Sequence, residues 1–591
     1  MKRKYLNKPS KFNNTPFVEV KNEAYKVVNG WDAIVVKLNE SIASLGQAKR
    51  FIVIEAYQGV IYEEVENNLR KGLKTDRFVN AADFMLPENG IKKMVFQDVT
   101  NDRVFGFLTR LQIDAYFDEK KVKAFQEEIS QAEGTILVYG TGAAHLCPNP
   151  DLLVYADMAR WEIQLRMRKH LVDNIGVKNR DTADWMLLYK QGFFVDWRVC
   201  DRLKKKLFDQ WDFVLDTNKA GQPKLVEGKA VLEGLEIASK RPFSVVPFFD
   251  PGPWGGQWMK EVCNLDPKPQ NYAWCFNCVP EENSLLLRFG NDIIEIPSIN
   301  LVFRHPSELL GEPVHGRFGD EFPIRYDFLD TMDGGHLSLQ VHPLTEYIQE
   351  KFGMHYTQDE SYYMMDTKED AIVYLGLKEG VNPKAMMDEL VEAQSGGATF
   401  ETEKHVQSWP VKKHDHVLIP AGTVHCSGKN SMVLEISTTP YIFTFKLWDW
   451  GRLGLDGKPR PINIKHGKNV IQWGRTTEWT RENLVNQIEK VAEGDGWVEE
   501  RTGLYKSEFI ETRRHWFTKK TEHDTAGGVQ VICLVEGGEV VVESPSNIFE
   551  SFVVNYAEVF IVPASVGKYT IRPYGDAEGT KCGTLKAYVR F

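Results

Sequence analysis

The sequence predicts a multidomain fold, with a parallel α/β part followed by a mainly-β part. The chain has 591 residues, and a single hydrophobic core stops growing at about 250–300 residues, so several domains are expected. Strand and helix signals alternate in the first third, which is typical of a parallel sheet. Later strands are separated by Gly and Pro turns, and one of them has a polar face that suits the inside of a barrel.

Composition limits the class of protein. Lys and Arg total 72, Asp and Glu total 82, and the net charge is −10. This balance argues against nucleic acid as the main partner, because phosphate binding needs clustered cations. No apolar run reaches 18 residues and no apolar segment follows the basic N-terminus, so we expect no membrane partner and no secretory signal. The scattered cysteines suggest a cytoplasmic location, and the pair Cys275 and Cys278 is expected to be structural.

In the first third, strands are expected at 51–55, 134–140 and 151–157, and helices at 118–133 and 160–170. A phosphate-binding loop after the first strand would need several Gly residues, a Lys and a Ser or Thr. The segment 55–62 has one Gly, no Lys and no hydroxyl at the required place. We therefore expect no ATP binding there.

The later stretch TILVYGTGAAHLCPNPDLLVYADMARWEIQLRMRKHL nonetheless resembles the second half of a P-loop sugar or nucleoside kinase. The resemblance implies a degenerate kinase-like domain at 45–240, after an N-terminal extension at 1–44. Its role would be structural, or it would bind a sugar phosphate without ATP. The basic residues Arg160, Arg166, Arg168 and Lys169 would be the remnant of a lid, although a solvated helix face is the interpretation we favour.

Three segments after residue 245 point to a metal site. In the strand GHLSLQVHP, alternate residues share a face, so Ser338, Gln340 and His342 point the same way as His336. In KKHDHVLIPAGTVH, a Pro-Ala-Gly turn presents His425 inward, and Glu360 opens a third strand. Amide, imidazole and carboxylate ligands suit zinc and, less selectively, other divalent ions.

These segments resemble the class I mannose-6-phosphate isomerases, a metal-dependent branch of the cupins. The matching stretches are WGGQWMKEV, LSLQVHP, DESYYMM, VKKHDHVLIPAGTVHC, VLEIS and FKLWDWGRLGLDGKPRPINI. The resemblance implies a catalytic cupin domain at 245–500 with a helical insert near 380–394, and a metal-free C-terminal cupin domain at 501–591. The ligands it implies for one zinc or other divalent ion are Gln340, His342, Glu360 and His425.

The resemblance also implies catalytic and substrate-binding residues. Glu435 matches a carboxylate discussed as acid/base, although it is equally expected as a partner that orients His425. Lys446 stands where the family usually has Arg. On the substrate side the family usually has two lysines, whereas this sequence has Gln358 and Asp327 in their places.

Two further substrate-side residues remain. Arg325 is expected to compensate for the lost lysines, and Ser338 is kept. The loss weakens the case for a phosphorylated substrate, because a phosphate dianion needs positive charge or N–H donors.

Three functions are compatible with these features. The first is a zinc-dependent isomerase that interconverts mannose 6-phosphate and fructose 6-phosphate through a cis-enediol. The second is a cupin isomerase or binding protein for a different or unphosphorylated sugar. The third, a kinase–isomerase fusion, is disfavoured by the missing phosphate loop. In each case the partner is a small sugar or sugar phosphate.

Overall fold

The computed structural model describes residues 4–46, 48–439, 441, 443–453, 457, 460, 462–503 and 505–591. The chain forms two compact units, each assembled from separated stretches of sequence. The first unit comprises Met1–Pro16, Ser239–Asn283 and His305–Phe591, and the second comprises Phe17–Ala238 and Ser284–Arg304. No described helix is long and apolar enough to cross a bilayer.

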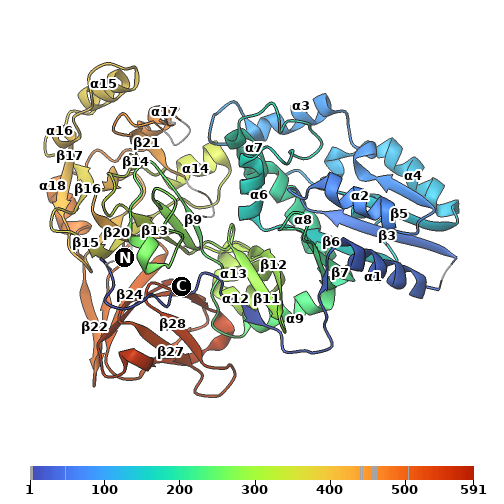
Figure 1. Ribbon diagram of the computed structural model, residues 1–591. Helices are drawn as coiled ribbons and strands as arrows, with labels where there is room; N and C mark the ends of the chain where they lie inside the picture. Colours follow the sequence, from blue (N-terminus) through green and yellow to red (C-terminus); the bar gives the residue numbers. More distant parts are fainter. Residues whose placement is uncertain are drawn as a thin grey trace. The chain divides into compact units, whose positions relative to one another are not determined.

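The second unit is built on a seven-stranded, mostly parallel sheet flanked by helices (Figure 1). In order across the sheet, the strands are β2 (Val28–Asn29), β8 (Lys224–Glu227), β7 (Phe213–Asp216), β6 (Leu152–Asp157), β3 (Lys49–Ala56), β5 (Gly134–Gly140) and β4 (Arg77–Asn80). Strands β4, β5, β3, β6 and β7 are parallel to one another, β8 runs antiparallel to β7, and β2 runs antiparallel to β8. The predicted parallel α/β part is therefore present.

The helices of this unit follow their sequence signals. Helix α4 (Glu119–Gln131) begins where the Asp118 carboxylate accepts the N–H groups of Lys120 and Lys121, which is a typical N-cap. The other main helices are α1 (Trp31–Ser44), α2 (Tyr62–Gly72), α3 (Glu88–Val99), α6 (Arg160–Arg168), α8 (Trp197–Leu207) and α9 (Gly228–Ser239). A small sheet of β1 (Val18–Glu19), β11 (Ser284–Phe289) and β12 (Asp292–Pro297) joins a late stretch of sequence to this unit.

The first unit contains two pairs of antiparallel sheets. The six-stranded sheet of the first pair is β18 (His416–Ile419), β15 (Glu360–Thr367), β20 (Ser431–Ser437), β13 (Arg325–Asp330), β10 (Trp274–Cys278) and β9 (Phe248–Asp250). Its partner sheet is β17 (Val406–Pro410), β16 (Ile372–Leu377), β19 (His425–Ser427), β14 (Leu339–Val341) and β21 (Phe445–Trp448). Helix α15 (Pro383–Gln394) lies between β16 and β17 in sequence, at the place of the predicted insert.

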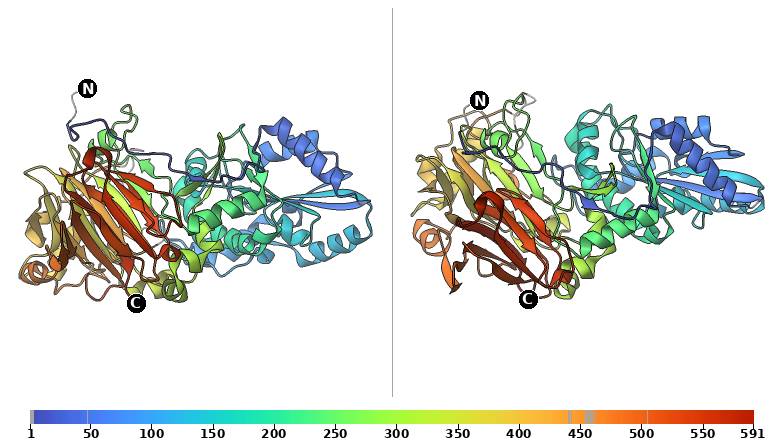
Figure 2. Two further views of the ribbon diagram at one scale, coloured as in Figure 1. Left: turned by 90° about the horizontal axis from the view of Figure 1, so that it is seen from below. Right: turned by 60° about the horizontal axis from the view of Figure 1, so that its bottom comes forward.

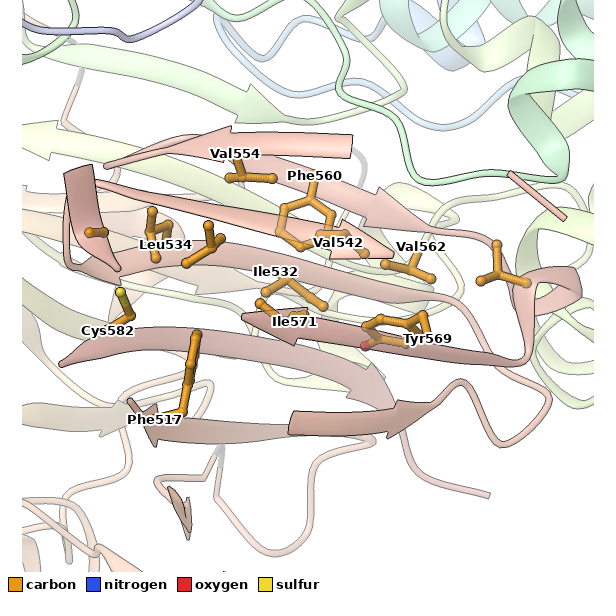
Figure 3. Close-up of a cluster of buried hydrophobic side chains, with 13 residues drawn as sticks. Phe517, Ile532, Leu534, Val542, Val554, Phe560, Val562, Tyr569, Ile571 and Cys582 are labelled. Atoms are coloured by element: carbon orange, nitrogen blue, oxygen red, sulfur yellow. The ribbon is translucent and has the colours of Figure 1, made fainter. Parts of the chain in front are cut away.

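The second pair forms the C-terminal part of this unit (Figure 2). One sheet is β22 (Glu489–Gly494), β23 (Trp497–Arg501), β24 (Ile510–Phe517), β31 (Cys582–Val589), β26 (Gln530–Glu536) and β29 (Val559–Val562). The other is β25 (Thr521–Asp524), β30 (Lys568–Pro573), β27 (Glu539–Glu543) and β28 (Phe552–Asn555). Their shared core is apolar, with side chains such as Phe517, Phe560 and Ile571 interdigitating between the sheets (Figure 3).

The described N-terminal residues lie along the first unit. The Glu261 carboxylate accepts the backbone N–H groups of Lys4, Tyr5 and Leu6 at 2.7–3.0 Å. Further along, Asn13 donates its N–H to Glu558 in the C-terminal sheet pair. This segment therefore spans both sheet pairs.

Candidate metal centre

Three side chains from the first sheet pair meet between its two sheets. The Glu360 carboxylate, at the start of β15, lies 3.1 Å from His342 Nε2 and 2.7 Å from His425 Nε2. All three side chains are fully buried. Despite these short separations, Glu360 Oε1 and His342 Nε2 have no well-formed hydrogen bond to any described residue. Two imidazoles and a carboxylate that converge without satisfying one another fit a divalent metal ion.

Backbone carbonyls fix the orientation of both imidazoles. Nδ1 of His342 lies 2.8 Å from the Phe443 carbonyl, and Nδ1 of His425 lies 2.8 Å from the Thr423 carbonyl. Each Nδ1–H is thereby held by an acceptor, which leaves Nε2 free to face the centre as a ligand. The preceding turn depends on Gly422, whose φ of 88° favours glycine, and its N–H donates to the His342 carbonyl at 3.0 Å.

The fourth residue of the predicted set, Gln340, lies at the same centre. It pairs directly with His425 across β14 and β19, and its amide nitrogen lies 3.2 Å from His425 Nε2. The structure therefore brings Gln340, His342, Glu360 and His425 together. His336 was expected on the same face of the strand, but it precedes β14 and packs against Trp450, with ring centroids 4.7 Å apart.

Gln358 links the Glu360 carboxylate to a second buried carboxyl group. Its amide nitrogen donates to Glu360 Oε2 at 3.1 Å and lies 3.5 Å from Glu435 Oε1, while its oxygen accepts the Phe443 N–H at 3.0 Å. Burial raises the pKa of Glu435 well above its ordinary value, and the nearby carboxylates of Glu360 and Asp327 raise it further. Burial opposes ionisation of Glu360 as well, but the two imidazoles outweigh it and lower that pKa.

The positive charge of Arg325 is already engaged. Its guanidinium donates to the Asp327 carboxylate two residues along the same strand, and both side chains are buried. Burial raises the pKa of Asp327 to about 6 although Arg325 opposes the shift. Arg325 therefore lies beside the centre as half of an ion pair, and not as an unpaired cation.

Lys446 lies opposite Gln340 in the register between β21 and β14. Burial lowers the pKa of Lys446 to about 7, and the nearby Arg460 guanidinium lowers it further. Ser338 donates to Asp449 at 2.8 Å, and Arg460 donates to both Ser338 and Asp449.

Sequence reasoning missed this network, which Arg452 completes by donating to Asp449 at 2.6 Å. A detectable signal was the pair of arginines that follow Asp449 in the segment FKLWDWGRLGLDGKPRPINI. Six residues of that segment, 454–456, 458, 459 and 461, lie outside the described residues.

In the second unit, basic side chains near the ends of β3 and β6 bind groups inside the fold. The Arg166 guanidinium donates to the carbonyls of Gly59 and Thr217 at 2.8 and 2.5 Å. Arg160 pairs with Asp201, and Lys204 pairs with Asp157 at 2.7 Å. The solvated helix face expected for the basic run is therefore wrong at Arg160 and Arg166. Their side chains are 1% and 3% exposed because they bind groups inside the fold.

The cysteines are all reduced and buried, including Cys275 and Cys278 on β10. Two further histidines, His515 and His523, lie inside the C-terminal sheet pair with ring centroids 4.8 Å apart. Among the described residues, the cluster of His342, Glu360 and His425 is the group of imidazole and carboxylate ligands close enough to share a metal ion.

A match to a known protein family ends at residue 240, close to Ala238, where the main segment of the second unit ends. Residues 30–240 match a family described as a domain of unknown function, DUF8485. The mannose-6-phosphate isomerase ManA of Bacillus subtilis (strain 168) is 26% identical over 232 residues, which cover 39% of this chain and 68% of that protein. The mannose-6-phosphate isomerase of Streptococcus mutans serotype c is 24% identical over 229 residues, 38% of this chain and 66% of that protein.

Solved structures also align with part of this chain. The mannose 6-phosphate isomerase from Bacillus subtilis aligns with a TM-score of 0.48 at 19% identity, over 59% of this chain and all of that chain. A mutant of phosphomannose isomerase from Salmonella typhimurium aligns with a TM-score of 0.46 at 12% identity, over 60% of this chain and all of that chain. The sequence relatives thus support the isomerase resemblance over about 40% of the chain. Nothing in the comparisons supports the kinase resemblance of residues 45–240.

Proposed function

We propose that this protein is a zinc-dependent aldose–ketose isomerase that interconverts mannose 6-phosphate and fructose 6-phosphate. The observation that carries the proposal is the enclosed cluster of His342, Glu360 and His425, with Gln340 beside it. The cluster lies in the part of the chain that resembles mannose-6-phosphate isomerases. Gln340, His342, Glu360 and His425 would hold the ion, which when bound would stabilise negative charge on the substrate oxygens.

The chain's own residues suit the proton transfer between neighbouring carbons. A general acid/base works best when its pKa is near the operating pH. Burial and neighbouring carboxylates raise the pKa of Glu435, so this carboxyl group holds a proton more readily than an exposed glutamate. Gln358 fixes its position through the amide that lies between Glu435 and Glu360. We assign the acid/base role to Glu435.

Lys446 is the second catalytic candidate. Its lowered pKa makes a neutral amine accessible near pH 7, whereas its protonated form would stabilise an enediolate. Ser338 lies in the adjoining network with Asp449 and would contribute to substrate binding together with Gln358.

The alternative is a different or unphosphorylated sugar. Three arginines near the centre, Arg325, Arg452 and Arg460, are each paired with an aspartate, and a fourth, Arg475, donates to the turn that precedes His425. A phosphate dianion would have to compete with these carboxylates, which reduces the positive charge available to it. Isomerisation and non-catalytic binding of a neutral sugar are both compatible with this charge balance.

A coupled isomerase assay combined with metal analysis tests the proposal. The purified full-length protein is loaded with zinc and offered mannose 6-phosphate, fructose 6-phosphate and mannose separately. We expect one bound ion per chain and turnover of the phosphorylated pair. Turnover of mannose alone would favour the alternative, and a protein that binds no divalent ion would contradict both.

We further infer that the two sheet pairs are cupin-type barrels, a catalytic one within 245–500 and a metal-free C-terminal one that comprises 501–591 together with β22 and β23. The antiparallel strand order of both pairs and the apolar core of the C-terminal pair support this.

A further inference from the structure

A pocket of about 450 Å³ lies in the first unit, away from the side chains of the metal centre. It is formed by the end of α13 (Glu312–Phe318), the start of α14 (Thr345–Phe352), residues 355–359 and residues 507–509. Its volume is within the range of sites that hold small molecules, about 300–1,000 Å³. No part of the proposed isomerase mechanism uses it.

A buried carboxyl group without a complete set of partners lines this pocket. Glu508 Oε2 accepts the N–H of Tyr505 at 3.1 Å, but Glu508 Oε1 has no hydrogen-bond partner among the described residues. Glu508 is only 6% exposed, and an unpaired polar atom at such a buried site is destabilising. Burial raises the pKa of Glu508 well above its ordinary value, which favours the protonated carboxyl group that can both donate and accept.

The other walls of the pocket contain aromatic rings and side-chain hydroxyl groups. Phe318 and Phe509 each pack edge to face on Tyr356, with ring centroids 5.3 and 5.7 Å apart, and lie tilted against each other at 4.8 Å. Thr345 and Ser507 supply hydroxyl groups at the rim. This combination of aromatic carbon and groups that both donate and accept complements a polyhydroxylated molecule.

The charges of the lining disfavour an anion. Arg317 is a cation of the lining, and it stacks on the Phe509 ring at 4.8 Å. Glu321, Asp359 and Glu508 bring three carboxyl groups to the same space. A phosphate dianion would compete with the Glu321 and Asp359 carboxyl groups for the Arg317 guanidinium. A neutral ligand avoids that competition.

The segment 357–360, which leads into β15, separates the pocket from the candidate metal centre. Side chains alternate along extended backbone, so Thr357 and Asp359 face the pocket, whereas Gln358 and Glu360 face the centre. Asp359 Oδ1 accepts the N–H of Ala421 at 2.7 Å. That bond ties the pocket wall to the turn that precedes His425.

From this geometry we propose that the pocket is a second binding site, which takes a neutral hexose or hexitol and is separate from the metal centre. A ligand there gives Glu508 Oε1 the partner that no described residue supplies. It also contacts the wall residue Asp359, which directly precedes Glu360 and accepts the Ala421 N–H in the turn before His425.

Calorimetric titration of the zinc-loaded full-length protein with mannitol tests the site, because mannitol has no carbonyl and cannot be isomerised. We expect saturable binding to wild type and at least tenfold weaker binding to Thr345→Trp, which fills the rim. The matched control Glu346→Trp changes the neighbouring exposed residue, which does not line the pocket, and is expected to bind as wild type does. Glu508→Gln keeps a neutral donor and acceptor and should retain binding within about threefold, whereas Glu508→Ala should lose it.

His342→Ala distinguishes this site from the metal centre. Binding of mannitol to His342→Ala at wild-type affinity supports a separate site, whether or not the protein proves to be an isomerase. Loss of mannitol binding in His342→Ala, or its survival in Thr345→Trp, would place the ligand at the centre and overturn the proposal. So would the absence of mannitol binding to wild type, or tighter binding of mannose 6-phosphate or glucosamine that Thr345→Trp abolishes.

Discussion

Glu360 Oε1 lies 2.7 Å from His425 Nε2, and both side chains are completely buried from solvent. The two residues are 65 positions apart in sequence and come from different sheets of the same pair. Folding therefore assembles the centre, and its integrity reports on the packing of the two sheets. A bound ion would contribute its binding free energy to the folded state.

Replacing either imidazole should remove the metal without unfolding the protein. For His342→Ala and His425→Ala we expect loss of bound zinc and at least a hundredfold loss of isomerase turnover. The reason is that two or three remaining ligands hold a divalent ion poorly. Metal content by mass spectrometry and circular dichroism of the folded protein provide the check. His336→Ala, which changes a histidine outside the centre, serves as the control and should keep its metal.

Part of the candidate metal centre could be predicted from sequence, because the alternation along a short strand and the Pro-Ala-Gly turn are local features. Gln340 and His342 share one face through the period of two, and Gly422 adopts the φ that the turn requires. The parallel α/β sheet was also predictable, since its buried strands read as continuous apolar runs.

Long-range charge pairing could not be predicted in the same way. The helical pattern of the sequence predicts that Arg160 and Arg166 lie on a solvated helix face. In the folded chain, Arg160 instead pairs with Asp201, and Arg166 donates to the Gly59 carbonyl. Likewise, the sequence does not reveal that Arg325 is neutralised by Asp327. Such pairings depend on tertiary contacts that carry no local periodicity.

Lys446 should destabilise the fold most at neutral and acid pH. Folding lowers its pKa from 10.5 to about 7, so the unfolded chain binds more protons between these values. Stability linked to Lys446 therefore rises with pH across that window, and the penalty is fully present below pH 7. Lys446→Met should raise the free energy of unfolding by about 1–4 kcal/mol at pH 6 and change it little above pH 10.5. Urea denaturation at the two pH values measures this difference, and an equal gain at both would contradict the buried, titrating amine.

His416 should make the protein sensitive to acid. Its ring is fully buried, neither nitrogen has a hydrogen-bond partner among the described residues, and burial lowers its pKa to about 3 with the help of Arg514. The unfolded chain therefore binds more protons between about pH 6.5 and pH 3, and stability falls as the pH drops through that window. From pH 7 to pH 5 this one group should remove about 2 kcal/mol. Denaturation midpoints of His416→Phe across that range should fall less steeply than those of wild type. An unchanged pH dependence would show that other groups control acid unfolding.

A variant of Lys204 tests whether a buried ion pair stabilises the second unit at the end of β6, where Asp157 lies. Its ammonium group donates to Asp157 at 2.7 Å and to Asn300 at 3.0 Å, and both side chains of the ion pair are at most 1% exposed. Removing one partner of a buried pair leaves the other charge unpaired, so Lys204→Met should lower the free energy of unfolding by about 3–5 kcal/mol. Lys206→Met, two residues away on the exposed side of α8, should change it by less than about 0.5 kcal/mol. Thermal unfolding of both variants decides the matter, and equal melting temperatures would mean that the carboxylate of Asp157 is solvated in the folded protein.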